Sequence, residues 1–95
     1  MSNMNTLNDE VLENAVGGYN TTDPNGAHWQ ATGYKMGTTF VMQGMRWYRI
    51  QNGDTLGNIA RTFGTTVEQL QKNNPKTITN PGMIYAGDAI VIRRA

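Results

Sequence analysis

The alternation of apolar and polar residues changes its period twice in the second half of the chain. Residues 48–50 alternate as a half-buried strand does, and residues 52–54, Asn-Gly-Asp, are typical of a turn. Over residues 56–63 the apolar side chains recur at helical spacing instead, and Asp54 or Thr55 suits the cap at the start of that helix. The pattern therefore predicts a strand, a tight turn and a short amphipathic helix.

A second helix and a final strand follow. Thr66-Val67-Glu68-Gln69 fits a capping box, and Pro75 ends the helix near Asn73 or Asn74. Residues 89–92 then return to a strand pattern. Because two strands cannot bury both of their faces, we expect the two helices to cover one side of a small antiparallel sheet, which is an α+β fold.

These segments resemble the LysM domain, a small βααβ module that binds N-acetylglucosamine polymers such as peptidoglycan and chitin. The motifs that carry the resemblance are Tyr48-x-Ile50, Gly53-Asp54-Thr55-Leu56, Phe63-Gly64-Thr65-Thr66-Val67, and Asn80-Pro81 through Ile84-Tyr85-Ala86-Gly87. The resemblance covers residues 47–93. It implies two helices packed on one face of a two-stranded antiparallel sheet, in a domain of residues 46–95.

The resemblance also implies a ligand groove between the loop before the first helix and the loop before the last strand. The implied carbohydrate-binding residues are Gly53, Asp54, Thr55, Leu56, Asn80, Pro81, Gly82, Met83, Ile84 and Tyr85. An N-acetyl group offers one amide donor, one acceptor and a methyl, so such a groove needs backbone polar groups beside a small apolar niche. The alternative is that Gly53-Asp54-Thr55 is only a turn and a helix cap and that Ile84 belongs to the core. For most of these residues both interpretations hold together.

Composition narrows the classes of function. The chain has 95 residues, a net charge of +1 and no cysteine. The small charge argues against a nucleic acid as the partner of the whole chain, and the missing cysteine excludes thiol catalysis and thiolate metal sites. The carboxylates are dispersed, His28 has no neighbouring acid or second histidine in the sequence, and no apolar run is long enough for membrane insertion. We therefore expect a binding module, not an enzyme, with no cofactor and no metal.

The first eighteen residues have a different character. Residues 4–18 combine acidic residues with an apolar stripe and end in Gly17-Gly18, which on pattern alone is a short amphipathic helix with a glycine cap. The stretch also resembles the double-glycine leader of peptides that bacteriocin-type ABC transporters export. That resemblance implies a transporter peptidase as a partner, which cuts after Gly18, and a secreted, cell-wall-associated product from a cytoplasmic precursor. The implied leader-recognition residues are Met4, Leu7, Leu12 and Ala15.

Residues 19–45 are open to two interpretations. A flexible linker is one, since the segment is rich in glycine and threonine and holds the turn sequence Asp23-Pro24-Asn25-Gly26. A weak β-hairpin is the other, in which residues 30–35 pair with residues 38–42 about Met36-Gly37. Three of its aromatic residues, Trp29, Tyr34 and Phe40, are unusual for a pure linker.

Two functions follow from these features. The first is a secreted carbohydrate-binding module that recognises N-acetylglucosamine-containing glycan, either bacterial peptidoglycan or chitin. The alternative is a bacteriocin-like antimicrobial or signalling peptide in residues 19–45, which the LysM domain targets to the cell wall. The oligomeric state has no signal in the sequence.

Overall fold

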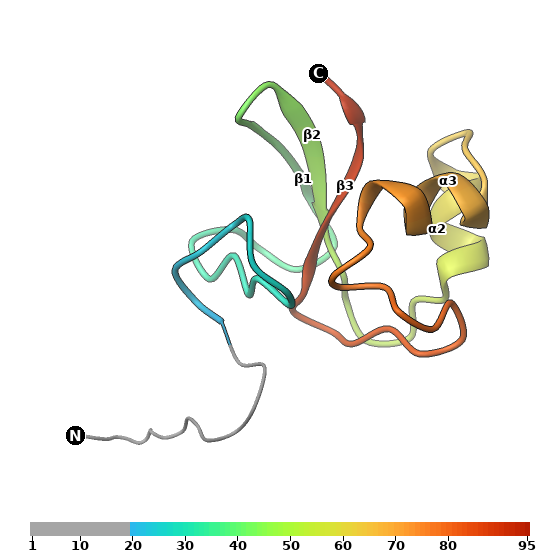
Figure 1. Ribbon diagram of the computed structural model, residues 1–95, viewed down its shortest axis with the longest axis horizontal. Helices are drawn as coiled ribbons and strands as arrows, with labels where there is room; N and C mark the ends of the chain where they lie inside the picture. Colours follow the sequence, from blue (N-terminus) through green and yellow to red (C-terminus); the bar gives the residue numbers. More distant parts are fainter. Residues whose placement is uncertain (1–19) are drawn as a thin grey trace.

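Residues 20–95 are the part of the chain that the computed structural model describes. Figure 1 shows a β-hairpin of β1 (Thr39–Met42) and β2 (Met45–Arg49), then α2 (Leu56–Thr62) and α3 (Val67–Asn73), and a last strand β3 (Ala89–Arg94). The predicted order of strand, helix, helix and strand is confirmed. The leader expected over residues 1–18 lies outside the described residues.

Both helices begin at threonine caps. The Thr55 hydroxyl accepts a hydrogen bond from the Asn58 backbone N–H, and the Thr66 hydroxyl accepts one from the Gln69 backbone N–H, each at 3.1 Å. The capping box at Thr66 is only half formed, because the Gln69 side chain donates to the Asn73 side chain and does not reach back. Neither α2 nor α3 has the length or the apolar character that a bilayer crossing requires, and this holds for every helix in the described chain.

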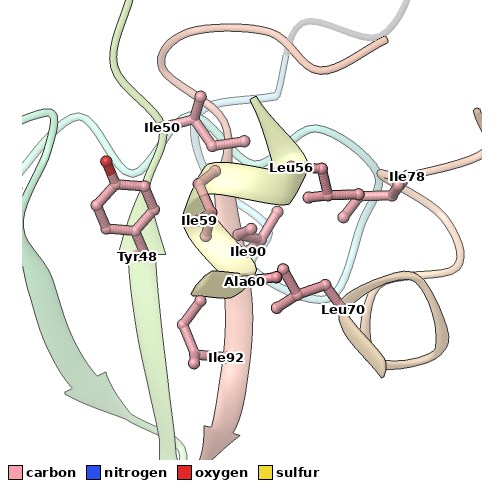
Figure 2. Close-up of a cluster of buried hydrophobic side chains, with 9 residues drawn as sticks. All are labelled: Tyr48, Ile50, Leu56, Ile59, Ala60, Leu70, Ile78, Ile90 and Ile92. Carbon is pink, nitrogen blue, oxygen red and sulfur yellow. The ribbon is translucent and has the colours of Figure 1, made fainter. Parts of the chain in front are cut away.

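One face of the sheet is covered by the two helices. Alternate residues of β3, Ile90 and Ile92, point to this face, as Figure 2 shows, and they meet apolar side chains from both helices. Ile90 and Leu70 have no exposed surface at all. We call this cluster the helix-face core; its members are Tyr48, Ile50, Leu56, Ile59, Ala60, Leu70, Ile78, Ile90 and Ile92.

The sheet has three strands, and not the two that the sequence predicted. The order is β1-β2-β3 and both pairs are antiparallel. The hairpin expected about Met36-Gly37 is wrong: β1 pairs with β2, and the chain turns at Gln43-Gly44. Gln43 and Gly44 have positive φ values of 55° and 72°. A two-residue turn with positive φ at both positions matches the right-handed twist of the strands that it joins.

The other face of the sheet is covered by residues 20–38. Trp29 packs edge to face against Phe40 and Trp47, with ring centroids 5.9 and 5.1 Å apart, and its carbonyl accepts the Ala89 backbone N–H at 2.8 Å. Together with Ala31 these residues form a second buried cluster, the sheet-back core. The described part of residues 19–45 is therefore packed on the sheet and is not a flexible linker. The boundary predicted between residues 45 and 46 falls inside the β1–β2 hairpin.

Candidate functional site

The two candidate loops leave the sheet at the same end. Arg49, the last residue of β2, is the register partner of Ala89, the first residue of β3. One residue further out, Ile50 donates its backbone N–H to the Asp88 carbonyl and accepts the Gly87 N–H, both at 2.8 Å. The loop after β2 and the loop before β3 therefore start from a shared hydrogen-bonded base.

The first loop is held in shape by Asp54. Its carboxylate accepts hydrogen bonds from the Tyr48 hydroxyl at 2.6 Å and from the Gln51 backbone N–H at 3.0 Å. Burial, and then the Asp54 carboxylate, raise the pKa of the Tyr48 hydroxyl well above its ordinary value. Asp54 therefore has a structural task, whether or not it also contacts a ligand.

The remaining residues of this loop differ in how accessible they are. Gly53 has a φ of 89°, and the space where a Cβ would stand is open, so its backbone is accessible to a ligand. Thr55 is exposed but its hydroxyl caps α2. Leu56 is only 3% exposed and belongs to the helix-face core. Its burial favours a supporting role beneath the loop over direct lining of a groove.

The second loop presents two exposed apolar residues. The Asn80 side chain accepts the Gly82 backbone N–H, and the Asn80 carbonyl accepts the Met83 N–H, both at 2.9 Å, so the loop closes in a turn that includes Pro81. Met83 and Tyr85 are 54% and 52% exposed.

Ile84 lies between these two exposed residues in the second loop. It is half-buried and packs against the helix-face core, to which Leu56, the first residue of α2, also belongs. The apolar base of both loops is thus one continuous cluster, while the assignment of the ten residues to carbohydrate contacts stays a prediction.

A buried carboxylate beside the second loop has no signal in the sequence. The Asp88 side chain is 3% exposed, and its Oδ2 lies 2.7 Å from His28 Nδ1, while the Gln30 side-chain amide donates to Oδ1. Burial raises the pKa of Asp88, and the bonds from His28 and Gln30 act in the opposite direction. His28 has no acidic neighbour in the sequence, but the fold brings it to Asp88, which lies 60 residues further along the chain.

Two other features lie away from these loops. A pocket of about 280 Å³ opens on the sheet-back side, and its lining includes Pro24, Trp47 and Lys76. Among residues 20–95, no three His, Asp or Glu side chains gather closely enough to hold a metal ion.

The Tyr48 hydroxyl, which bonds Asp54 of the first loop, makes the stability of the fold sensitive to alkaline pH. Because its folded pKa is raised above the unfolded value of about 10, neutral Tyr48 stabilises the fold below pH 10, and this contribution is lost as pH rises further. We expect the free energy of unfolding to fall above about pH 10 by up to roughly 1.4 kcal/mol per pH unit from this group. Tyr48→Phe should remove that part of the decline. Parallel curves for the two proteins in urea titrations from pH 9 to 11.5 would contradict the buried Tyr48–Asp54 bond.

Residues 48–93 match the family described as LysM domain, so the chain contains a LysM domain. The N-acetylmuramoyl-L-alanine amidase XlyA of Bacillus subtilis (strain 168) is 43% identical over 49 residues, which are 52% of this chain and 16% of that protein. The endolysin of Bacillus phage B103 is 48% identical over 46 residues, or 48% of this chain and 17% of the endolysin. The probable endopeptidase p60 of Listeria seeligeri is 41% identical over 46 residues, or 48% of this chain and 8% of p60.

The chain therefore spans less than a fifth of the length of each of these three relatives. No solved structure matches the chain significantly.

Proposed function

We propose that this protein is a carbohydrate-binding module that recognises N-acetylglucosamine-containing glycan, with bacterial peptidoglycan as the first candidate and chitin as the second. The observation that carries the proposal is the LysM domain at residues 48–93, with both of its candidate loops raised from one end of the sheet. The names of the relatives support peptidoglycan, since one is an N-acetylmuramoyl-L-alanine amidase and another an endolysin.

The exposed groups of the two loops fit the chemistry of an N-acetyl sugar. The open backbone at Gly53 offers polar main-chain groups, and Met83 and Tyr85 offer apolar surface, while Ile84 connects that surface to the core. An N-acetyl group requires both kinds of contact at once. In this proposal Asp54 and Thr55 hold the first loop in shape, and any contact they make with the sugar is secondary.

The same arrangement supports binding without catalysis. The Asp54 carboxylate is bonded to Tyr48 and Gln51, and the Asp88 carboxylate is buried against His28 and Gln30. Neither is placed in the open as a general acid facing a second carboxylate, as glycan hydrolysis requires. We infer that the LysM domain supplies attachment to the glycan.

A single groove of this size predicts modest affinity. We expect a dissociation constant of roughly micromolar to millimolar for N-acetylglucosamine oligomers, because a few hydrogen bonds and a small apolar surface are all that two short loops supply. Titration of the ¹⁵N-labelled protein with the hexamer, followed by NMR, tests this. Residues 53–56 and 80–85 should show the largest shifts. If the shifts are instead concentrated around the pocket of Trp47 and Lys76, the binding site lies on the sheet-back side and not at the two loops.

We also propose that residues 1–18 are a double-glycine leader and that the protein is exported by a peptidase-containing ABC transporter. The spacing of Met4, Leu7, Leu12 and Ala15 before Gly17-Gly18 supports this. The transporter's peptidase would read the apolar stripe and accept only residues without side-chain bulk at the cut. The product, secreted and associated with the cell wall, would begin at Tyr19.

Leader processing predicts a change in mass. Gly17→Leu should leave an uncut precursor inside a cell that carries the transporter, because a bulky side chain blocks the cleft. Gly33→Ala serves as the control and should be cut normally. No atom lies close to the position that the added Cβ would take, so this substitution should not disturb the fold. Mass spectrometry of the medium and of the cells measures both. Export of an intact Gly17→Leu chain would falsify the leader proposal.

A bacteriocin-like peptide is the second candidate, favoured by the leader pattern alone. It requires residues 19–45 to act on a membrane or a receptor. The burial of Trp29 and Phe40 in the sheet-back core supports the binding module instead, because the aromatic residues that such a peptide would use are already packed. A growth-inhibition assay with the chain from Tyr19 onward separates the two proposals.

A further inference from the structure

A third segment reaches the end of the sheet from which the two candidate loops rise. Thr39, the first residue of β1, is the register partner of Tyr48, so β1 begins where β2 ends. Just before β1, the Gly37 N–H donates to the Arg49 carbonyl at 2.7 Å. The chain that precedes β1 is therefore brought beside the loops before and after the helices. Within it, His28 and Gln30 both bond Asp88, and the His28 ring also lies against Tyr85.

His28 is held from several sides. Its backbone N–H donates to the Thr77 hydroxyl at 3.0 Å, its Nδ1 bonds Asp88, and its ring lies edge-on to Tyr85 with centroids 5.8 Å apart. Its φ of 55° is left-handed, which is uncommon for a non-glycine residue, although histidine adopts it more readily than most. Backbone conformations of this kind occur often at functional sites.

The contacts leave one ring nitrogen unused. With Nδ1 bonded to the Asp88 carboxylate, which Gln30 also bonds, the orientation of the ring is fixed. Among residues 20–95 nothing bonds His28 Nε2, and the side chain is 29% exposed. Nε2 accepts or donates according to the protonation of the ring, and a sugar hydroxyl does both, so the two are complementary in either state. The half-exposed ring of Tyr85 adds an apolar surface beside it.

We propose that His28 and Tyr85 form an additional sugar subsite, in which Tyr85 supports one face of a pyranose ring and His28 Nε2 bonds one of its hydroxyls. The inference rests on the proposed function, because the subsite extends the same groove. His28 lies outside the LysM domain of residues 48–93, so the segment before that domain takes part in recognition. Asp88 and Thr77 are positioning residues in this arrangement, since they hold His28 and do not touch the glycan.

The subsite predicts that affinity depends on glycan length. In this proposal an N-acetylglucosamine hexamer occupies the subsite of His28 and Tyr85 as well as the two loops, and a trimer fills fewer subsites. His28→Asn is the informative variant, because asparagine tolerates the left-handed backbone and its amide replaces Nδ1 as the donor to Asp88, while Nε2 is lost. We expect hexamer binding to weaken by about threefold to tenfold, as for one lost hydrogen bond, with a smaller change for the trimer. Lys72→Ala, exposed on α3, is the matched control and should bind as wild type does.

The single histidine of the chain gives a direct readout that needs no variant. Hexamer should move the ¹⁵N resonance of His28 Nε2 in the wild-type protein, and Tyr85→Ala should reduce that movement. Titrating with chitin hexamer and with peptidoglycan fragments in parallel shows which source supplies the sugar. If the hexamer binds and shifts residues 53–56 while Nε2 stays fixed and His28→Asn binds equally tightly, the subsite is refuted and the proposed function stands. If neither glycan binds the wild type, both are refuted.

Discussion

Trp29→Ala should lower the free energy of unfolding by about 3–5 kcal/mol, the range for removal of a buried aromatic side chain. Trp29 is 7% exposed and packs edge to face against both Phe40 and Trp47. Its removal leaves a cavity between the segment before β1 and the back of the sheet. A small domain has a total stability of roughly 5–15 kcal/mol, so this one substitution removes a large share of it.

Urea unfolding followed by far-ultraviolet circular dichroism measures this loss without depending on tryptophan fluorescence. Val41→Thr is the control, because Val41 lies on β1, is 54% exposed and should change stability by less than about 0.5 kcal/mol. A Trp29→Ala protein within 1 kcal/mol of wild type would show that the residues before β1 are not part of the cooperative fold.

Ile84→Asp should weaken binding of N-acetylglucosamine oligomers by at least about tenfold, or roughly 1.4 kcal/mol. The substitution places a carboxylate in the apolar part of the candidate groove, where an N-acetyl methyl would desolvate it. Ile84 is half-buried against the helix-face core, so the variant must first be shown to be folded by circular dichroism.

Two further variants serve as controls for the binding of Ile84→Asp. Met83→Asp puts the same charge on the same loop at a side chain that is 54% exposed, so the fold is not at risk and binding should still weaken. Lys72→Ala removes an exposed charge on α3 and should leave binding unchanged. Full binding by folded Ile84→Asp and Met83→Asp together would show that the groove lies elsewhere.

Local pattern predicted the helix side of the fold well, because its determinants are close in sequence. Each capping threonine lies three residues before the backbone N–H from which its hydroxyl accepts a hydrogen bond. Leu56, Ile59 and Ala60 recur at helical spacing. The opposite face of the sheet also has a signal in the sequence. Ala89-Ile90-Val91-Ile92 is apolar without a break, which is typical of a strand buried on both faces, and the structure buries Ala89 and Ile90 on opposite sides.

The third strand was partly visible in the sequence. The pattern of residues 38–42 predicts an extended segment. Its pairing partner cannot be predicted, because nothing local shows that β2 pairs on both of its edges. Gln43 also takes a positive φ that asparagine or aspartate signals more often than glutamine. The pairing of β1 with β2 provides the sheet face on which Trp29 and Phe40 pack.

The candidate site could be located only through the resemblance to LysM domains. Gly53-Asp54-Thr55 by itself predicts a turn and a cap, and the bond from Tyr48 to Asp54 appears only in the folded chain. The contact of His28 with Asp88 is of the same kind, since no periodicity joins residues 60 positions apart. Interactions that close over such distances depend on the whole fold, and a single sequence holds no local record of them.

Co-sedimentation of the full chain with purified peptidoglycan and with chitin tests whether the protein is a glycan-binding module. We expect saturable binding to at least one of the two, at roughly micromolar to millimolar affinity, with release when soluble N-acetylglucosamine hexamer is added. Retention on the polymer that the hexamer does not compete away would indicate nonspecific adsorption. The proposed function would be contradicted if the folded wild-type protein stays in the supernatant with both polymers, even when the polymer supplies binding sites at about millimolar concentration.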